Sequence, residues 1–226
     1  MIQLTIHKDA YDLGIHNPIA CLIRNIEIKS ELSNSVSGDA RDMIAMLETN
    51  SQSILLKPEV IAFRQLFENL GYPNQIPAGQ RLIESFQKKG FKAYNNIIDS
   101  YNIASCLFGS GLGLHDAEGI KQDIHIYRAK GNERIKPIFK DKKTTIPNGD
   151  IVYSSSGKVI AWLGKKDVDS DEFKVVDNTK KLLLVALGNS QTSLEYNRSV
   201  CISAIRLMRK SCPNIYAQFI LTVLAD

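Results

Sequence analysis

The chain has 226 residues, of which 44% are hydrophobic and 23% are charged, and this composition excludes a disordered or fibrous protein. No apolar run reaches the roughly 18–20 residues that a membrane-spanning helix needs, and the first residues lack the basic start and long apolar stretch of a secretory signal. The four cysteines form no CxxC pair, so we expect free thiols in a cytoplasmic protein without a membrane partner.

Positive charge is concentrated in the second half of the chain. Residues 1–112 hold 10 Lys/Arg and 11 Asp/Glu, a net charge of −1, whereas residues 113–226 hold 18 and 13, a net charge of +5. The densest basic cluster consists of Arg128, Lys130, Arg134, Lys136, Lys140, Lys142 and Lys143. Such a cluster attracts phosphate groups, but solvated surface loops have the same composition, so the charge alone leaves both interpretations open.

Taken in chain order, the first half predicts two strands followed by helices. Residues 3–7 and 20–29 have the β-branched, partly alternating pattern of strands. The polar run 30–38 predicts a loop, and a short helix over 40–48 follows, with Asp39 as its N-cap. Pro58 suits the first turn of a helix over 59–70, and further helices are predicted over 80–89, ending at Gly90, and over 94–108.

The second half is dominated by strand patterns. Alternating or short apolar runs predict strands at 123–129, 151–154, 158–163, 173–176 and 182–187. A helix over 193–210 follows, and residues 215–224 are more strand-like than helical. Helices first and strands later indicate an α+β domain and not a repeating βαβ chain.

A glycine-rich segment after the helix predicted over 94–108 is the most informative feature. Gly109, Gly111 and Gly113 alternate with other residues, and His115, Asp116 and Glu118 follow directly. Glycine at every second position bares one side of the backbone, so a ligand or another segment can approach closely. The pattern therefore predicts either a site beside titratable groups or a simple helix cap and turn.

Familiar catalytic motifs are absent from this segment. A dinucleotide-binding fingerprint needs a strand before its glycines, whereas a helix precedes them here, and no Gly-Lys-Ser/Thr follows as in a P-loop. No GxSxG serine-nucleophile motif occurs. His115, Asp116, Glu118 and His125 have no recognised metal-ligand spacing. We therefore expect neither a metal nor another cofactor.

Between positions 60 and 190, a set of residues stands in a characteristic order: Arg64, Asp99, Asn102, Gly109, Asp116, Ile126, Arg128, Pro137, Gly149, Trp162 and Thr179. Their order and spacing resemble the B3/B4 domain of the phenylalanyl-tRNA synthetase β subunit, and more closely the free-standing proteins built from that domain. The resemblance implies a three-layer α+β fold with mixed β-sheets and flanking helices. A single domain would span residues 1–226, with strands and a short helix in 1–55 and a helix and strand in 191–226.

The same resemblance implies a function. In the synthetase this domain is the editing module, which hydrolyses the ester that joins a wrong amino acid to the 3′ end of tRNA. We therefore expect tRNA or aminoacyl-tRNA as the partner and ester hydrolysis in trans. A non-catalytic RNA-binding module and a pocket for a free amino acid remain as alternatives, and the oligomeric state is not assigned.

Site residues follow from the glycine segment and the resemblance together. His115 and Asn102 are the predicted catalytic residues, as a base and as a group that orients water, although Asn102 could instead lock the turn. The predicted substrate-binding residues are Gly109, Gly111, Gly113, Leu114 and Glu172. Alignment on the family anchors places Gly113 where the synthetase has a histidine, and it places the family's acidic residue near Asp171 or Glu172. The predicted RNA-binding residues are Arg64, Arg134, Lys136 and Lys140, of which Arg64 could instead form an internal ion pair.

Overall fold

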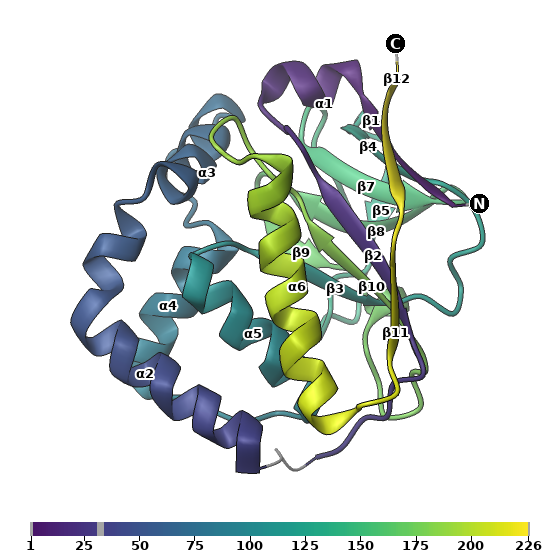
Figure 1. Ribbon diagram of the computed structural model, residues 1–226. Coiled ribbons are helices and arrows are strands. Elements are labelled where there is room, and N and C mark those ends of the chain that lie inside the picture. The colour runs from purple at the N-terminus through teal and green to yellow at the C-terminus, as the bar shows by residue number, and fades with distance from the viewer. Residues whose placement is uncertain (1, 31–33, 226) are drawn as a thin grey trace.

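The computed structural model describes residues 2–30 and 34–225, and it has helices on one side and β-sheets on the other (Figure 1). A six-stranded sheet has the order β12-β1-β4-β7-β8-β9, and a four-stranded sheet has the order β11-β2-β10-β3. The strands of the first are β12 (Leu221–Ala225), β1 (Gln3–His7), β4 (Ile124–Arg128), β7 (Ile151–Ser155), β8 (Lys158–Leu163) and β9 (Asp167–Asp169). Those of the second are β11 (Tyr216–Phe219), β2 (Ile19–Arg24), β10 (Lys181–Ala186) and β3 (Leu112–Asp116), and a small hairpin joins β5 (Arg134–Ile135) to β6 (Thr144–Thr145).

The helices begin and end at residues with a clear local role. They are α1 (Lys8–Leu13), α2 (Asn34–Leu55), α3 (Pro58–Asn69), α4 (Ala78–Lys89), α5 (Asn96–Phe108) and α6 (Leu194–Ser211), with a 3₁₀ turn η1 (Asp171–Phe173). The side chain of Asn95 caps α5, because it accepts the N–H groups of Ile97 and Ile98 at 3.1 and 2.8 Å. Gly109 ends the same helix in the left-handed region, with a φ of 66°. No helix within the described ranges is long and apolar enough to cross a membrane.

The core has three layers, which confirms the predicted α+β architecture with mixed sheets. Leu182 and Leu184 of β10 pack against α2, α5 and α6, whereas Leu183 and Val185 face the six-stranded sheet. This alternation follows from the two-residue period of a strand, so one buried strand serves two cores. Within the six-stranded sheet β1 runs parallel to β12 and β4, and the remaining pairs are antiparallel.

Several predicted boundaries change for tertiary reasons. The helix predicted over 40–48 is part of the longer α2, while residues 31–33 of the predicted loop lie outside the described residues. The strand predicted at 173–176 is wrong, because Phe173 ends η1 and residues 174–176 form no strand, and the edge of the sheet is formed by β9 instead. The segment 215–224 forms two strands in different sheets, and the chain crosses between them at Ile220, whose N–H donates to Ala20 at 3.0 Å.

Candidate functional site

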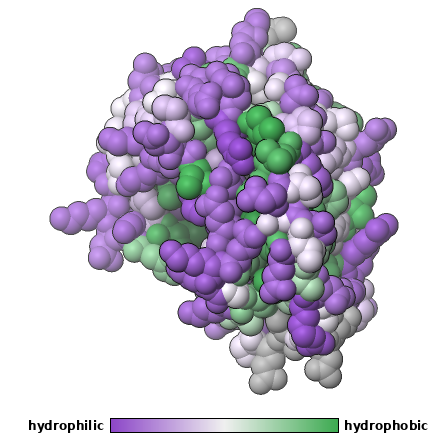
Figure 2. All heavy atoms as spheres, turned by 90° about the vertical axis from the view of Figure 1, so that its left-hand side faces the viewer, coloured by the Kyte–Doolittle hydropathy of each residue, from purple (hydrophilic) through white to green (hydrophobic). Residues whose placement is uncertain are grey.

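A cavity of about 370 Å³ lies where helices α3, α4 and α5 meet the glycine segment and the β9 edge of the six-stranded sheet. Side chains of Phe63 and Phe67 form an apolar part of its wall. Its polar part comes from α4, α5, β7 and β9, through Arg81, Tyr101, Asn102, Ser105, Tyr153, Asp167 and Asp169. The face over α2, α3 and α4 is largely hydrophilic, with a hollow in which apolar side chains are visible (Figure 2). A volume of this size suits a small molecule or one end of a larger one.

The glycine segment forms one wall of the cavity. Gly109, Gly111 and Gly113 all line it. Gly79, in the first turn of α4, packs against the segment so closely that a Cβ on Gly79 would lie 2.5 Å from the carbonyl oxygen of Gly109. The glycines therefore cap α5, as in the helix-cap interpretation, and they also allow the N-terminus of α4 to reach the turn.

The residues after Gly111 form strand β3 and not a bend. β3 pairs with β10 in antiparallel register, with Gly113 opposite Val185 and His115 opposite Leu183. Alternation along the strand places Leu114 in the core on the helical side, away from the cavity. The predicted substrate residues thus separate, because the three glycines line the cavity and Leu114 does not.

His115 lies between the two sheets and does not line the cavity. Its ring is fully buried, and its Nε2 lies 2.8 Å from the hydroxyl of Tyr153, which does line the cavity. Its Nδ1 has no hydrogen-bond partner among the described residues. Burial lowers the pKa of His115 to about 3, so the imidazole stays neutral at physiological pH. The ring therefore reaches the cavity only through Tyr153.

The space beside Gly113 is taken by the same pair. A Cβ on Gly113 would meet the Tyr153 hydroxyl, and it would lie 2.8 Å from Nε2 of His115. No side chain fits at position 113 without displacing this pair. The space that a side chain at position 113 would need is thus filled from the other sheet, by the tyrosine to which His115 is hydrogen-bonded.

Helix α5 presents three polar side chains to the cavity. Tyr101, Asn102 and Ser105 all line it, and Ser105 is 2% exposed with no partner for its Oγ within the described chain. Asp99, three residues before Asn102, has a structural role, because its carboxylate accepts the N–H of Tyr94 at 3.0–3.1 Å. The D-x-x-N pattern therefore combines an anchor for the start of α5 with an amide at the cavity wall.

Two carboxylates that the sequence interpretation missed lie on β9. Asp167 and Asp169 are two residues apart on one strand and both line the cavity. Asp167 lies 3.3 Å from the Arg81 guanidinium, and burial raises its pKa while Arg81 and the backbone N–H of Ala78 oppose the rise. For Asp169, burial and the neighbouring Asp167 raise the pKa to about 7. The alternating Asp-Val-Asp pattern was the available signal, because it places both carboxylates on one face of a strand.

The acidic residues predicted from the resemblance lie elsewhere. Glu172 is in η1, where it pairs with Lys158 at the surface and does not line the cavity. Asp171 pairs with Lys136 at 2.8 Å. These residues follow β9 directly, but the chain turns outward at η1, which takes their side chains away from the cavity.

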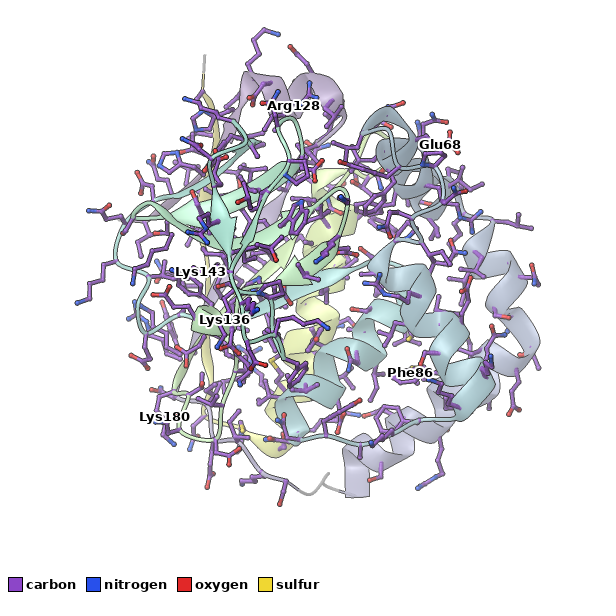
Figure 3. The ribbon with its side chains drawn as sticks, turned by 180° about the vertical axis from the view of Figure 1, so that it is seen from behind. Glu68, Phe86, Arg128, Lys136, Lys143 and Lys180 are labelled. Carbon is purple, nitrogen blue, oxygen red and sulfur yellow. The ribbon has the colours of Figure 1, made fainter. Side chains whose placement is uncertain are left out.

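The four predicted RNA-binding residues fall into two groups. Arg64 makes hydrogen bonds inside the fold, since its Nε donates to the side-chain oxygen of Gln80 at 2.6 Å and its Nη2 donates to the carbonyl of Leu55 at 3.1 Å. Lys136 forms its ion pair with Asp171, whereas Arg134 and Lys140 are exposed. Lys136 and Lys143 lie on the sheet side of the molecule, away from Phe86 and its helix α4 (Figure 3).

Comparisons with known proteins agree with this architecture. The model of the B3/4 domain family matches residues 70–207. An N-terminal fragment of the phenylalanyl-tRNA synthetase β-subunit from Pyrococcus horikoshii is similar in structure, with a TM-score of 0.55 and 12% sequence identity over 100% of this chain and 52% of that one. The likeness concerns the fold, and this chain spans about half of that fragment. A comparison with curated proteins gives no match.

Proposed function

The chain belongs to the B3/4 domain family, and on that basis we propose that it binds aminoacyl-tRNA and hydrolyses the ester between the amino acid and the 3′ end. The observation that supports this proposal most is the cavity of about 370 Å³, which is walled by glycine backbone and by polar side chains. Small-molecule pockets of roughly 300–1,000 Å³ are common in proteins, so an aminoacyl group fits a space of this kind.

Hydrolysis of an aminoacyl ester requires a positioned water and donors for the developing oxyanion. The N–H groups of Gly109 and Ser110 are used to close α5, on Cys106 and Ser105 at 3.3 and 3.1 Å. We therefore assign the N–H of Gly111 and the side-chain amide of Asn102 as the donors that stabilise the oxyanion. Water adds to the ester carbonyl, and the ribose oxygen leaves with a proton. The hydroxyl of Tyr153, which is hydrogen-bonded to His115, lies beside Gly113 at the same wall.

The surface proposed for the tRNA lies beside the strand that carries the cavity carboxylates. The N–H of Asp171 donates to the backbone carbonyl of Lys136 at 2.8 Å, and the N–H of Ile138 donates to the backbone carbonyl of Asp169 at 3.0 Å. Residues 136–138 therefore lie alongside the end of β9. Phe139 follows with 88% of its surface exposed, next to the exposed Lys140. Basic side chains and an exposed ring together suit a single-stranded RNA end, by phosphate attraction and base stacking.

The ester half-life of charged tRNA tests the catalytic proposal. We expect the purified protein to shorten the half-life of at least one member of a panel of mischarged aminoacyl-tRNAs, and Asn102→Ala to slow this reaction by about ten- to a thousandfold. Unchanged half-lives across the whole panel would refute hydrolysis.

For the RNA surface, tRNA binding at low salt is compared between Lys140→Glu and Lys88→Glu, an equal change of charge at the exposed end of α4. We expect only Lys140→Glu to weaken binding and to reduce its salt dependence. Equal effects of the two variants would place the tRNA elsewhere.

One observation favours a second candidate function, a tRNA-binding module without catalysis. The imidazole of His115 is buried away from the cavity, and Gly113 stands where the synthetase has a histidine. Under this alternative the protein retains tRNA in a gel-shift assay at low salt, but every ester in the panel keeps its intrinsic half-life. Turnover of any one ester excludes it.

A further inference from the structure

The carboxylate of Asp169 is the one acidic group at the cavity that the described part of the chain does not neutralise. It lines the cavity from β9, and no described residue donates a hydrogen bond to its side chain or forms an ion pair with it. Its backbone carbonyl, in contrast, is engaged by the N–H of Ile138 at 3.0 Å. The strand is therefore held in place while the carboxylate itself stays available.

The neighbouring Asp167 does not share this property. Its carboxylate lies 3.3 Å from the Arg81 guanidinium, and its side chain is 17% exposed. The backbone N–H of Ala78, at the N-terminus of α4, also stabilises its charged form. One carboxylate is thus balanced by a cation and a helix terminus, and the cavity keeps one unbalanced negative charge when Asp169 is ionised.

A second observation points independently to a ligand. Ser105 on α5 is 2% exposed and lines the same cavity, and its Oγ has no hydrogen-bond partner among the residues described. A buried hydroxyl without a partner is costly, because it has given up water without a replacement. A ligand that donates hydrogen bonds would satisfy both the carboxylate and this hydroxyl.

We propose that the cavity recognises the primary ammonium group of its ligand, with Asp169 as the counter-ion and the Ser105 hydroxyl as a further acceptor. An ammonium group supplies three donors and a full positive charge, which matches an unpaired carboxylate and an unpaired hydroxyl that line the same cavity. An anionic or neutral ligand would leave the Asp169 charge buried and unbalanced. The inference rests on the proposed function only in identifying this ammonium as the α-amino group of the aminoacyl ester.

Amino alcohols test this inference without tRNA. L-alaninol, L-leucinol, L-phenylalaninol and L-tyrosinol keep a protonated amine at about pH 8, where the Asp169 carboxyl is ionised, and their N-acetyl derivatives lack the charge but keep the side chain. Binding of each pair is measured by titration calorimetry to the parent protein, to Asp169→Asn and to Glu172→Gln. Glu172→Gln is the matched control, because it makes the same carboxylate-to-amide change outside the cavity.

We expect the parent protein to bind at least one amino alcohol at least about tenfold more tightly than its N-acetyl derivative, since charge-assisted hydrogen bonds contribute roughly that much. Asp169→Asn should lose this preference, and Glu172→Gln should keep it. Ser105→Ala should weaken binding of the amine a fewfold. Equal affinity for amine and acetamide, full affinity in Asp169→Asn, or no binding of any amino alcohol would each overturn the inference.

The outcome is separable from that of the deacylase proposal. A protein that hydrolyses a mischarged tRNA but binds no amine overturns the ammonium inference alone. A protein that binds amines through Asp169 but leaves every ester intact overturns hydrolysis and keeps the inference.

Discussion

Replacing Asp169 with Asn should stabilise the protein above neutral pH. Burial and Asp167 raise the pKa of the Asp169 carboxyl to about 7 from its ordinary value of 3.8. The folded protein therefore keeps a proton that the unfolded chain releases, and stability is lost as the pH rises from about 4 through 7. Above that window the parent protein carries an unfavourable buried charge that the Asn variant lacks.

The size of the effect follows from the shift. A change of about three units, at 1.36 kcal/mol per unit, gives roughly 4 kcal/mol for a site sealed from water. Because the cavity admits solvent, we take about half of this, near 2 kcal/mol. Of the groups around Asp169, burial raises the pKa of Tyr101 and Tyr153 above the window.

Urea unfolding at about pH 4.5 and pH 8.5 measures the effect. We expect Asp169→Asn to exceed the parent by about 2 kcal/mol at the higher pH and by a small fraction of that at the lower pH. The exposed Glu172→Gln variant should show no such dependence on pH between 6 and 8.5. If Asp169→Asn is less stable than the parent at pH 8.5, the carboxylate has a structural partner and the reasoning is wrong.

Three further substitutions probe the frame of the site. Gly79→Ala should cost about 1–3 kcal/mol in urea unfolding, because its Cβ would meet backbone at 2.5 Å, whereas a Cβ on Gly119 meets nothing within 4 Å and Gly119→Ala should be neutral. Tyr153→Phe should cost about 1–3 kcal/mol, since His115 then loses its one partner, and a thermal midpoint equal to that of the parent would refute this. Arg64→Ala should lower the melting temperature but leave the affinity for tRNA unchanged, and a selective loss of tRNA binding would restore Arg64 to the RNA surface.

The helices were predictable because their patterns are local, whereas the three layers were expected from the family resemblance. Helices α3, α4, α5 and α6 each carry an apolar stripe with a proline, glycine or polar cap at an end, and these signals act within one or two turns. The continuous apolar run of β10 was also visible in the sequence. What it serves, a core on each face, depends on partners distant in the chain.

The placement of His115 could not be predicted from its neighbours. Residues after Gly111 form a strand because β10 pairs with them, and β10 lies far along the chain. Once that pairing exists, the two-residue period turns Gly113 and His115 toward the second sheet. A bend would have directed the imidazole to the cavity, and the local pattern is equally consistent with either.

The carboxylates of β9 escaped prediction for a related reason. Asp167–Asp169 is short, lies between lysines and further acids, and has the composition of a loop. It becomes a strand by pairing with β8, and its face is set by that pairing. Glu172 is three residues further along, yet the turn at η1 separates its environment from that of Asp169.

The glycine wall and the charge of the cavity are physically connected. Because Gly79 lacks a side chain, the N-terminus of α4 can lie against the turn at Gly109, and this places Ala78 and Arg81 beside Asp167. The helix terminus and the guanidinium balance that carboxylate, so the second one, Asp169, faces the cavity alone. A Cβ at position 79 would push α4 away from the turn and loosen the hold on Asp167. The cavity would then hold two unbalanced carboxylates in place of one. Gly79→Ala should therefore increase the preference for an ammonium ligand over its N-acetyl derivative while it destabilises the fold, and calorimetry with the same pairs of ligands measures this preference.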